Sequence, residues 1–229
     1  MSLLQTIADT LFPTTCACCG EVLVGQERQL CLGCLSRLEL ADFTAQDDNQ
    51  TARMLMGRVD CHAATSLYVF KQGSTVRRVV HAMKFHSNSD LCLLMGRQMG
   101  YELMRNSRFD DVDVLLPVPL HWLRRLNRGY NQSELLCRGI AQVFDRPVSV
   151  GDVVRHRYTR KQSLQPNAGR NANVDGAFRL KHPERLAGKH VLVVDDVLTT
   201  GATISACASV LAEVPGVTVS VATLCIVQR

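Results

Sequence analysis

Four aliphatic residues run directly into two adjacent carboxylates in the segment Val191-Leu192-Val193-Val194-Asp195-Asp196-Val197-Leu198-Thr199-Thr200-Gly201-Ala202-Thr203. A continuous apolar run of this kind is typical of a strand buried on both faces of a parallel sheet. Open α/β sheets bind ligands beyond the carboxyl ends of their strands, where Asp195 and Asp196 would lie. The loop that follows offers threonine hydroxyls and the N–H groups of an opening helix, which suit a phosphate. Carboxylates for sugar hydroxyls beside donors for a phosphate indicate a ribose 5-phosphate ligand.

The composition is that of an ordinary soluble globular protein. The chain has 229 residues, of which 46% are hydrophobic and 21% charged, so it can hold one domain with an appendage or two small domains. No apolar run approaches the ~18 residues of a membrane span. Residues 1–12 carry Asp9 and no basic residue, so they do not read as a signal peptide. Their leucines and isoleucine fall at helical spacing, which predicts a short docking helix.

The chain divides into a small Cys-rich unit and a larger α/β domain. We expect residues 1–45 to form an N-terminal helix and a zinc ribbon, the polar residues 46–50 to belong to a linker, and residues 60–229 to form the second domain. Alternating strand and helix patterns in that domain predict a mostly parallel sheet covered by helices. The expected strands are 63–70, 112–118, 190–194 and 217–227, and the expected helices are 74–85, 89–104, 132–144 and 202–213. Residues 155–176 are polar and aperiodic, which predicts a long loop.

Two paired-cysteine motifs predict a metal centre. Cys16-x2-Cys19 and Cys31-x2-Cys34 are separated by eleven residues, and two such turns can place four thiolates around one Zn²⁺ in a closed structural site. Gly20 and Gly33 would supply the backbone freedom that these turns need. Free buried thiols are the alternative, and the part played by Cys18 stays open. The other cysteines sit among apolar residues and are expected in the core: Cys61, Cys92, Cys137, Cys207 and Cys225.

The charge is unevenly distributed along the chain. Residues 1–50 hold two basic and seven acidic residues, whereas residues 119–179 hold eleven basic residues, ten of them arginine, against four acidic ones. A positive middle segment suits pyrophosphate, a nucleotide or a nucleic-acid backbone, although a solvated basic face would look the same. The acidic Cys-rich unit should repel a phosphate backbone, so a protein contact suits it better.

The quoted segment resembles, over all thirteen positions, the PRPP-binding motif of type I phosphoribosyltransferases. Together with the four-Cys ribbon it resembles the ComF family, which includes the GntX-type proteins. Further matching blocks are His81-Ala82-Met83-Lys84-Phe85, Pro117-Val118-Pro119-Leu120, Arg125-x2-Arg128-Gly129-Tyr130-Asn131-Gln132, Thr159-x2-Gln162 and Arg170-x2-Asn173. One departure is Gln165, where the family usually has leucine.

This resemblance implies a type I phosphoribosyltransferase fold that binds PRPP with Mg²⁺. Asp195 and Asp196 would hold the ribose hydroxyls, and Lys84 would add a positive charge at the reacting centre. Thr199, Thr200, Gly201, Ala202 and Thr203 would wrap the 5-phosphate. The turn Val118-Pro119-Leu120 would bind pyrophosphate, with Arg125 and Arg128 nearby. A flexible loop would close over the centre through Arg157, Thr159, Gln162, Arg170 and Asn173.

The resemblance also implies cytoplasmic work in the uptake or use of external DNA, beside a DNA-translocating helicase. It does not supply the acceptor base, and no general base is evident, since His81, His86 and His121 qualify by residue type alone. Two alternatives to phosphoribosyl transfer therefore remain. One is a sensor that binds PRPP or a nucleotide without turnover. The other is an accessory that binds single-stranded DNA through arginines and through Trp122, Tyr130 or Tyr158.

Overall fold

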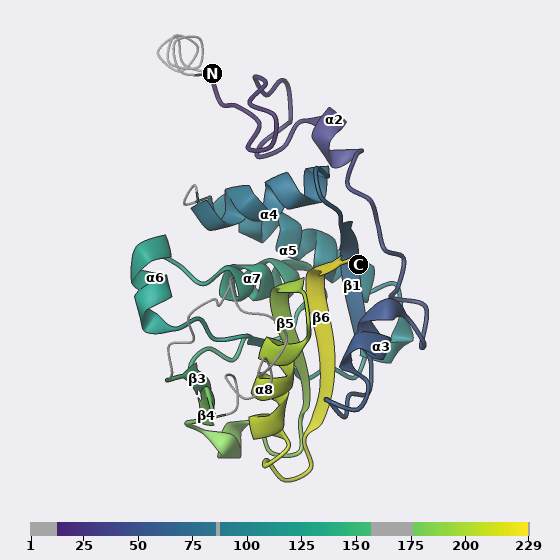
Figure 1. Ribbon diagram of the computed structural model, residues 1–229, viewed down its shortest axis with the longest axis vertical. Coiled ribbons are helices and arrows are strands. Elements are labelled where there is room, and N and C mark those ends of the chain that lie inside the picture. The colour runs from purple at the N-terminus through teal and green to yellow at the C-terminus, as the bar shows by residue number, and fades with distance from the viewer. Residues whose placement is uncertain (1–12, 86–87, 157–175, 229) are drawn as a thin grey trace, which may run out of the picture.

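A four-stranded parallel sheet forms the centre of the protein (Figure 1). The computed structural model describes residues 13–85, 88–156 and 176–228. The strand order is β1-β6-β5-β2, with β1 at Ala64–Phe70, β6 at Thr218–Val227, β5 at His190–Leu198 and β2 at Val114–Pro117. Neighbouring strands are parallel throughout, so their carboxyl ends share one edge of the sheet.

Helices cover both faces of this sheet. On one face lie α4 (Thr75–Phe85), α5 (Ser89–Leu103) and α7 (Gln132–Phe144), whose apolar side chains share a core with the Cys-rich unit. On the other face lie α3 (Gln50–Leu55) and α8 (Ala202–Leu211), which form a second core. Figure 1 shows α8 in front of β5 and β6. The fold is therefore a three-layer sandwich, as the alternating sequence pattern predicts.

Glycines allow α5 and α7 to touch backbone to backbone. A Cβ at Gly96 would lie 2.3 Å from the carbonyl oxygen of Leu136, and a Cβ at Gly139 would lie 2.4 Å from that of Leu93. Any larger residue would force the two helices apart. This close packing fixes the position of the N-terminus of α7, which faces the carboxyl ends of β2 and β5.

Shorter elements surround the sandwich. The Cys-rich unit contains α2 (Leu32–Leu35) and lies beyond α4 at one end of the molecule (Figure 1). The helix α6 (Trp122–Arg128) follows β2, and β3 (Val153–Arg155) pairs in antiparallel fashion with β4 (Phe178–Leu180). Two 3-10 turns occupy Ser107–Phe109 and Pro183–Arg185. No helix in the described part of the chain is long and apolar enough to cross a membrane.

The structure corrects two sequence expectations. The strand predicted to end at residue 194 continues to Leu198, because Asp195 and Val197 remain in register with Thr223 and Cys225 of β6. The residues taken for a linker are folded into the domain. Asn49 is buried, caps α3 and donates from Nδ2 to the carbonyl of Ala64, 2.7 Å away.

The other expected elements are present, with ends that differ by up to two residues. The helix 202–213 ends two residues early, at Leu211. Arg155, placed at the start of a loop, instead ends β3. Residues 157–175 of that loop, and the N-terminal helix expected over 1–12, lie outside the described residues.

Candidate functional site

A hollow of about 370 Å³ opens at the carboxyl ends of β2 and β5. It brings together residues that are far apart in the chain and that the sequence assigns to one site. Its lining includes Lys84, Val118, Pro119, Leu120, Asp195, Asp196, Thr199 and Thr203. It also includes residues that the sequence reasoning did not assign, namely Asn131, Gln132, Ser133 and Arg155.

Asp195 is held by two donors on one of its oxygens. Both the Ser133 hydroxyl and the Asp196 backbone N–H donate to Oδ1, each over 2.9 Å. Burial, followed by the negative charge of Asp196, raises the pKa of Asp195 to about 7. Asp195 can therefore change its protonation state near neutral pH. Ser133 was missed because a serine in the first turn of a helix carries no sequence signal of its own.

Asp196 forms an ion pair with Lys84. The distance from Lys84 Nζ to Asp196 Oδ2 is 2.7 Å, and the two side chains are 20% and 15% exposed. Lys84 lies in the last turn of α4, where the helix dipole favours a cation. The pair places one positive and one negative group at the carboxyl ends of the strands.

The block Tyr130-Asn131-Gln132 forms hydrogen bonds to two segments that border this site. Tyr130 Oη and Gln132 Nε2 donate to the carbonyl of Met83, over 2.7 and 3.4 Å, next to Lys84. Asn131 Nδ2 donates to the carbonyl of Val118 over 3.1 Å, and Asn131 Oδ1 caps α7. The block therefore fixes both the helix end that carries Lys84 and the turn after β2.

The loop after β5 leads into α8, whose N-cap residue has no side chain to cap the helix, and the Ala202 N–H donates only a long hydrogen bond, of 3.5 Å, to Thr200 Oγ1. Gly201 adopts φ +78, which favours glycine, and serves as the N-cap residue. Thr199 and Thr203 line the hollow on either side of it. The uncapped N–H groups and the positive end of the helix dipole suit an anion at this point.

Arg125 lies in a neighbouring hollow of about 210 Å³, not in the one that holds Asp195 and Asp196. Its guanidinium is 58% exposed and lies 3.7 Å from Glu134, which also pairs with Arg138 at 2.9 Å. Arg155 lines both hollows and its guanidinium lies over the ring of Phe178. Arg155 is thus better placed than Arg125 to reach a ligand on the carboxylates.

Several expected site residues fall outside the described part of the structure. The side chain of Arg128 is one of them, although its backbone ends α6. The loop residues Arg157, Thr159, Gln162, Arg170 and Asn173 are the others.

The four paired cysteines form one compact cluster. The sulfur atoms of Cys16, Cys19, Cys31 and Cys34 all lie within 4.8 Å of one another. Zinc in a tetrahedral thiolate site needs Zn–S distances of about 2.3 Å, which separates the sulfurs by about 3.8 Å. The four thiols therefore fit such an ion with small adjustments.

Neighbouring backbone groups favour the thiolate form of one of these four cysteines, Cys16. Burial acts to raise the pKa of Cys16, but hydrogen bonds from backbone N–H groups, that of Cys31 first, lower it to about 6. A thiolate is the form that binds metals. Gly20 adopts φ +79 as expected, whereas the expectation for Gly33 is wrong, because it lies within α2 at ordinary helical geometry.

The remaining cysteines lie apart from the cluster. The sulfur of Cys18 lies 3.9 Å from the carbonyl of Thr75 in α4, so it points away from the four thiols. Cys92, Cys137, Cys207 and Cys225 are buried in the core as expected, and Cys61 is half-buried.

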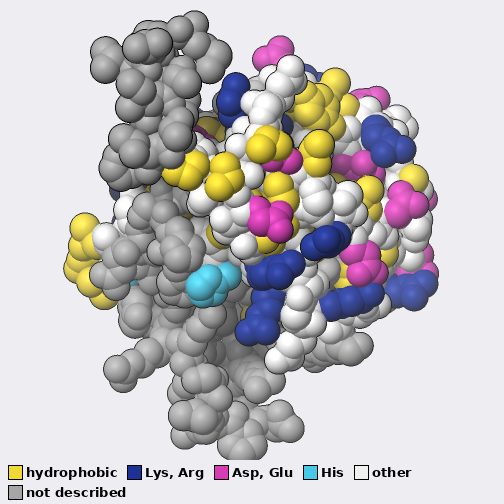
Figure 2. All heavy atoms as spheres, turned by 90° about the horizontal axis from the view of Figure 1, so that it is seen from above, with side chains coloured by type: hydrophobic (Ala, Val, Ile, Leu, Met, Phe, Trp, Pro, Cys, Tyr) yellow, Lys and Arg dark blue, Asp and Glu magenta, His cyan; other side chains and the backbone are white. Residues whose placement is uncertain are grey.

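The face at the Cys-rich end carries mixed charge. Figure 2, which views that end, shows Lys and Arg side chains gathered beside a histidine, with acidic side chains above and around them. On this side Arg77, Arg78 and His81 of α4 line a hollow of about 380 Å³ against Cys18. The acidic unit thus borders basic residues of α4.

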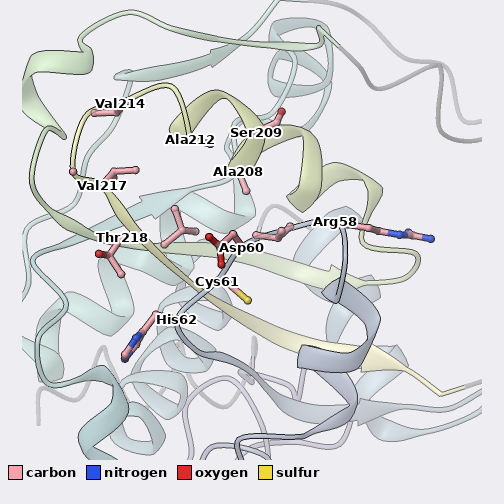
Figure 3. Close-up of a pocket in the computed structure, with 13 residues that line it drawn as sticks. Arg58, Asp60, Cys61, His62, Ala208, Ser209, Ala212, Val214, Val217 and Thr218 are labelled. Atoms are coloured by element: carbon pink, nitrogen blue, oxygen red, sulfur yellow. The ribbon is translucent and has the colours of Figure 1, made fainter.

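A larger hollow, of about 550 Å³, lies at the opposite end of the sheet (Figure 3). Residues 58–62 line it together with the end of α8 and the start of β6. The nearby His190 is engaged through its Nε2, which lies 2.8 Å from Ser220 Oγ; its Nδ1 lies 3.0 Å from Asp111 Oδ1 but does not form a hydrogen bond in the described residues. By size alone this hollow would be the candidate functional site. The chemistry instead favours the hollow at the carboxyl end of the strands, where the half-buried carboxylates, the lysine and the helix N-terminus lie together.

Comparison with known proteins agrees with this assignment. Residues 131–229 match the phosphoribosyl transferase domain. DNA utilization protein YhgH of Shigella flexneri is 33% identical over 150 residues, 64% of this chain and 65% of that protein. Competence protein F of Haemophilus influenzae is 34% identical over 94 residues, 41% of each chain. The match thus spans about two thirds of the length of the YhgH proteins.

Among solved structures, glutamine PRPP amidotransferase from B. subtilis gives a TM-score of 0.37 at 20% identity, over 61% of this chain and 26% of that one. A TM-score of 0.37 is too low to show a common fold. The domain match, the relatives, the parallel sheet and the four-Cys cluster confirm the expected fold class and the resemblance to the ComF family.

Proposed function

Because this chain carries a phosphoribosyl transferase domain and is a relative of Competence protein F and the YhgH proteins, we propose that it binds PRPP or a phosphoribosyl nucleotide. The observation that carries the proposal is a convergence in one hollow. Two adjacent carboxylates, a lysine and an uncapped helix N-terminus meet at the carboxyl ends of β2 and β5.

Each part of the ligand has a matching part of the site. Asp195 and Asp196 would accept hydrogen bonds from the 2- and 3-hydroxyls of the ribose. The N–H groups that open α8, with the hydroxyls of Thr199 and Thr203, would hold the 5-phosphate. The turn Val118-Pro119-Leu120, fixed by Asn131, would offer backbone groups to pyrophosphate.

Mg²⁺ would be held here by the carboxylate oxygens of Asp195 and Asp196, since it prefers oxygen ligands. It would supply a positive charge that offsets the negative charge of the leaving pyrophosphate. Lys84 would add a fixed positive charge 2.7 Å from Asp196. Ser133 would keep Asp195 turned toward the ribose. Phosphoribosyl transfer to an acceptor base is the reaction that these residues would support.

The Cys-rich unit has a different role in this proposal. Zn²⁺ held by Cys16, Cys19, Cys31 and Cys34 would close the cluster and stabilise the unit without taking part in the chemistry. Such thiolates persist in a reducing compartment, which supports a location in the cytoplasm. We further propose that this unit contacts a protein of DNA uptake, such as a helicase.

Two binding functions would share the same fold. A sensor would bind PRPP or a nucleotide with no turnover. An accessory for single-stranded DNA would use the exposed Trp122 and Arg125 of α6. The accessory would lose DNA affinity, with a smaller salt slope, on Arg125→Ala.

Calorimetric titration with PRPP and Mg²⁺ tests the proposal. The variant Asp195→Asn/Asp196→Asn should lose binding by at least about a hundredfold, because it removes two charged hydrogen-bond acceptors. The matched control is Asp60→Asn/Asp110→Asn, which removes the same charge from two exposed carboxylates elsewhere and should bind as the wild type does. A wild type that fails to bind PRPP would overturn the proposal and shift attention to DNA.

A further inference from the structure

Residues 54–58, to which the sequence analysis assigns no element, touch the phosphate loop, defined here as residues 199–203. After α3 the chain turns, and Arg58 Nη1 donates to the carbonyl of Thr200 over 2.5 Å, across 142 positions of sequence. We propose that Arg58 is a positioning residue that holds the phosphate loop in its binding conformation. This inference rests on the proposed function and adds a residue to the same site.

A second contact joins the same two segments. Gly201 lies against the end of α3, where a Cβ on it would come within 3.1 Å of Leu55 Cδ2 and 3.6 Å of the Met54 carbonyl. Adjacent residues of the loop are thus held by neighbouring residues of one short segment, Thr200 through Arg58 and Gly201 through Leu55. Contact at two points limits how the peptide between them can turn.

The geometry of that peptide gives Arg58 its importance. In a trans peptide the carbonyl of Thr200 and the N–H of Gly201 belong to one plane and point in opposite directions. A carbonyl bonded to Arg58 therefore turns the Gly201 N–H to the other side. If the peptide flipped, a carbonyl oxygen would replace that donor and would repel a phosphate instead of binding it.

The support itself is anchored in the core. Thr51 Oγ1 lies 2.7 Å from Ser66 Oγ, which lies 2.7 Å from Thr223 Oγ1, so buried hydroxyls link α3 through β1 to β6. Asn49 adds hydrogen bonds from Nδ2 to the carbonyls of Gln46 and Ala64, each over 2.7 Å. The segment that carries Arg58 is consequently a fixed support, not a mobile one.

Arg58 does not serve the larger hollow whose rim it joins. Figure 3 shows its side chain directed away from the other lining residues. Its one hydrogen bond given by the described residues goes to the phosphate loop. The arginine therefore acts on the 5-phosphate side of the site, and the pyrophosphate side, at residues 118–120, should not depend on it.

The test compares Arg58→Gln with Arg53→Gln, which removes the same charge from a residue on α3 that pairs with Asp48. Hydrogen exchange of the amides in 199–203, measured without ligand, should speed up about three- to tenfold in Arg58→Gln, the range expected for one exposed hydrogen bond. It should stay unchanged in Arg53→Gln and be partly restored in Arg58→Lys.

Calorimetry then separates the two halves of the ligand. The affinity of Arg58→Gln for ribose 5-phosphate should fall by the same factor, while its affinity for Mg²⁺ and pyrophosphate stays at the wild-type value. Unchanged exchange in the loop, or an equal loss for both ligands, would overturn the role of Arg58. If the wild type binds neither PRPP nor ribose 5-phosphate, the proposed function fails, and the exchange result alone still decides whether Arg58 holds the loop.

Discussion

The four-Cys cluster and the carboxylate pair differ in how their side chains are oriented and buried. The thiols of the cluster face one another within 4.8 Å, and three of the four cysteines are buried. The carboxylates of Asp195 and Asp196 stand side by side at an open hollow, each tied to a different neighbour, Ser133 or Lys84. The four thiols face one another, whereas the two carboxylates face the open hollow.

This difference is the one expected between a site that stabilises the fold and a site that binds a ligand. A closed set of four thiolates leaves no position for a substrate, so its free energy goes into folding. Burial and the neighbouring charge of Asp196 raise the pKa of Asp195 to about 7, which costs stability at neutral pH and is typical of functional sites. The two sites should therefore respond differently to mutation. Substitutions in the four-Cys cluster should unfold the Cys-rich unit, whereas substitutions of the two carboxylates should abolish ligand binding.

Removal of zinc should have the largest effect. Structural zinc contributes on the order of 10 kcal/mol to small domains, so chelation should unfold residues 13–40 and expose them to protease. The second core, on the face of α3 and α8, contains no residue of this unit, so the sheet should keep its circular dichroism and its affinity for PRPP. Zinc content and limited proteolysis before and after chelation are the measurements.

Two serine variants make this first test specific. Cys16→Ser should lower the zinc content, because it removes a ligand of the cluster, whereas Cys18→Ser should leave one zinc per chain. Equal zinc loss in both variants would mean that the cluster is not the closed site described here.

The pH dependence of stability should have the second-largest effect. The folded pKa of Asp195 is about 7, against about 3.9 in an unfolded chain, so the folded protein holds one more proton between these values. Stability must then fall as pH rises from about 4 to about 7. The variant Asp195→Asn has no titrating group at this position. The melting temperature of the wild type should therefore fall relative to that of the variant as the pH rises from 5 to 8.

Asp110→Asn serves as the reference for this second test, since Asp110 is exposed and lies outside the hollow. Its melting temperature should follow the wild type at every pH. Parallel curves for Asp195→Asn and the wild type would show that Asp195 ionises freely and that the pair is an ordinary surface feature.

Local sequence patterns predicted what depends on neighbours in the chain. The cysteine spacing gave the thiol cluster, and the apolar run before Asp195 gave the central strand of the sheet. Local patterns failed where contacts between residues far apart in the chain determine the structure. Asn49 looks like part of a polar linker until its side chain meets the carbonyl of Ala64. Arg58 has no motif at all, because its partner lies 142 residues away.

The same reasoning explains the misassigned neighbours of the site. Strand β5 runs past Asp195 because β6 continues beside it and satisfies the backbone groups. Ser133 and Arg155 reach the hollow only through the packing of α7 and the pairing of β3 with β4. A periodic pattern shows that a helix exists but not which of its first residues will face a ligand.

The smallest effect is expected at Arg125. Its guanidinium is 58% exposed, is 3.7 Å from Glu134 and lies outside the hollow that holds the carboxylates. Solvent and salt screen such a charge, so Arg125→Gln should change the affinity for Mg²⁺ and PRPP by less than about threefold. Arg155→Gln, at a residue lining that hollow, should cost about tenfold, the scale of one charged hydrogen bond. The reverse order in calorimetry would place pyrophosphate beside α6, as the sequence resemblance implies, and would extend the open site into the neighbouring hollow.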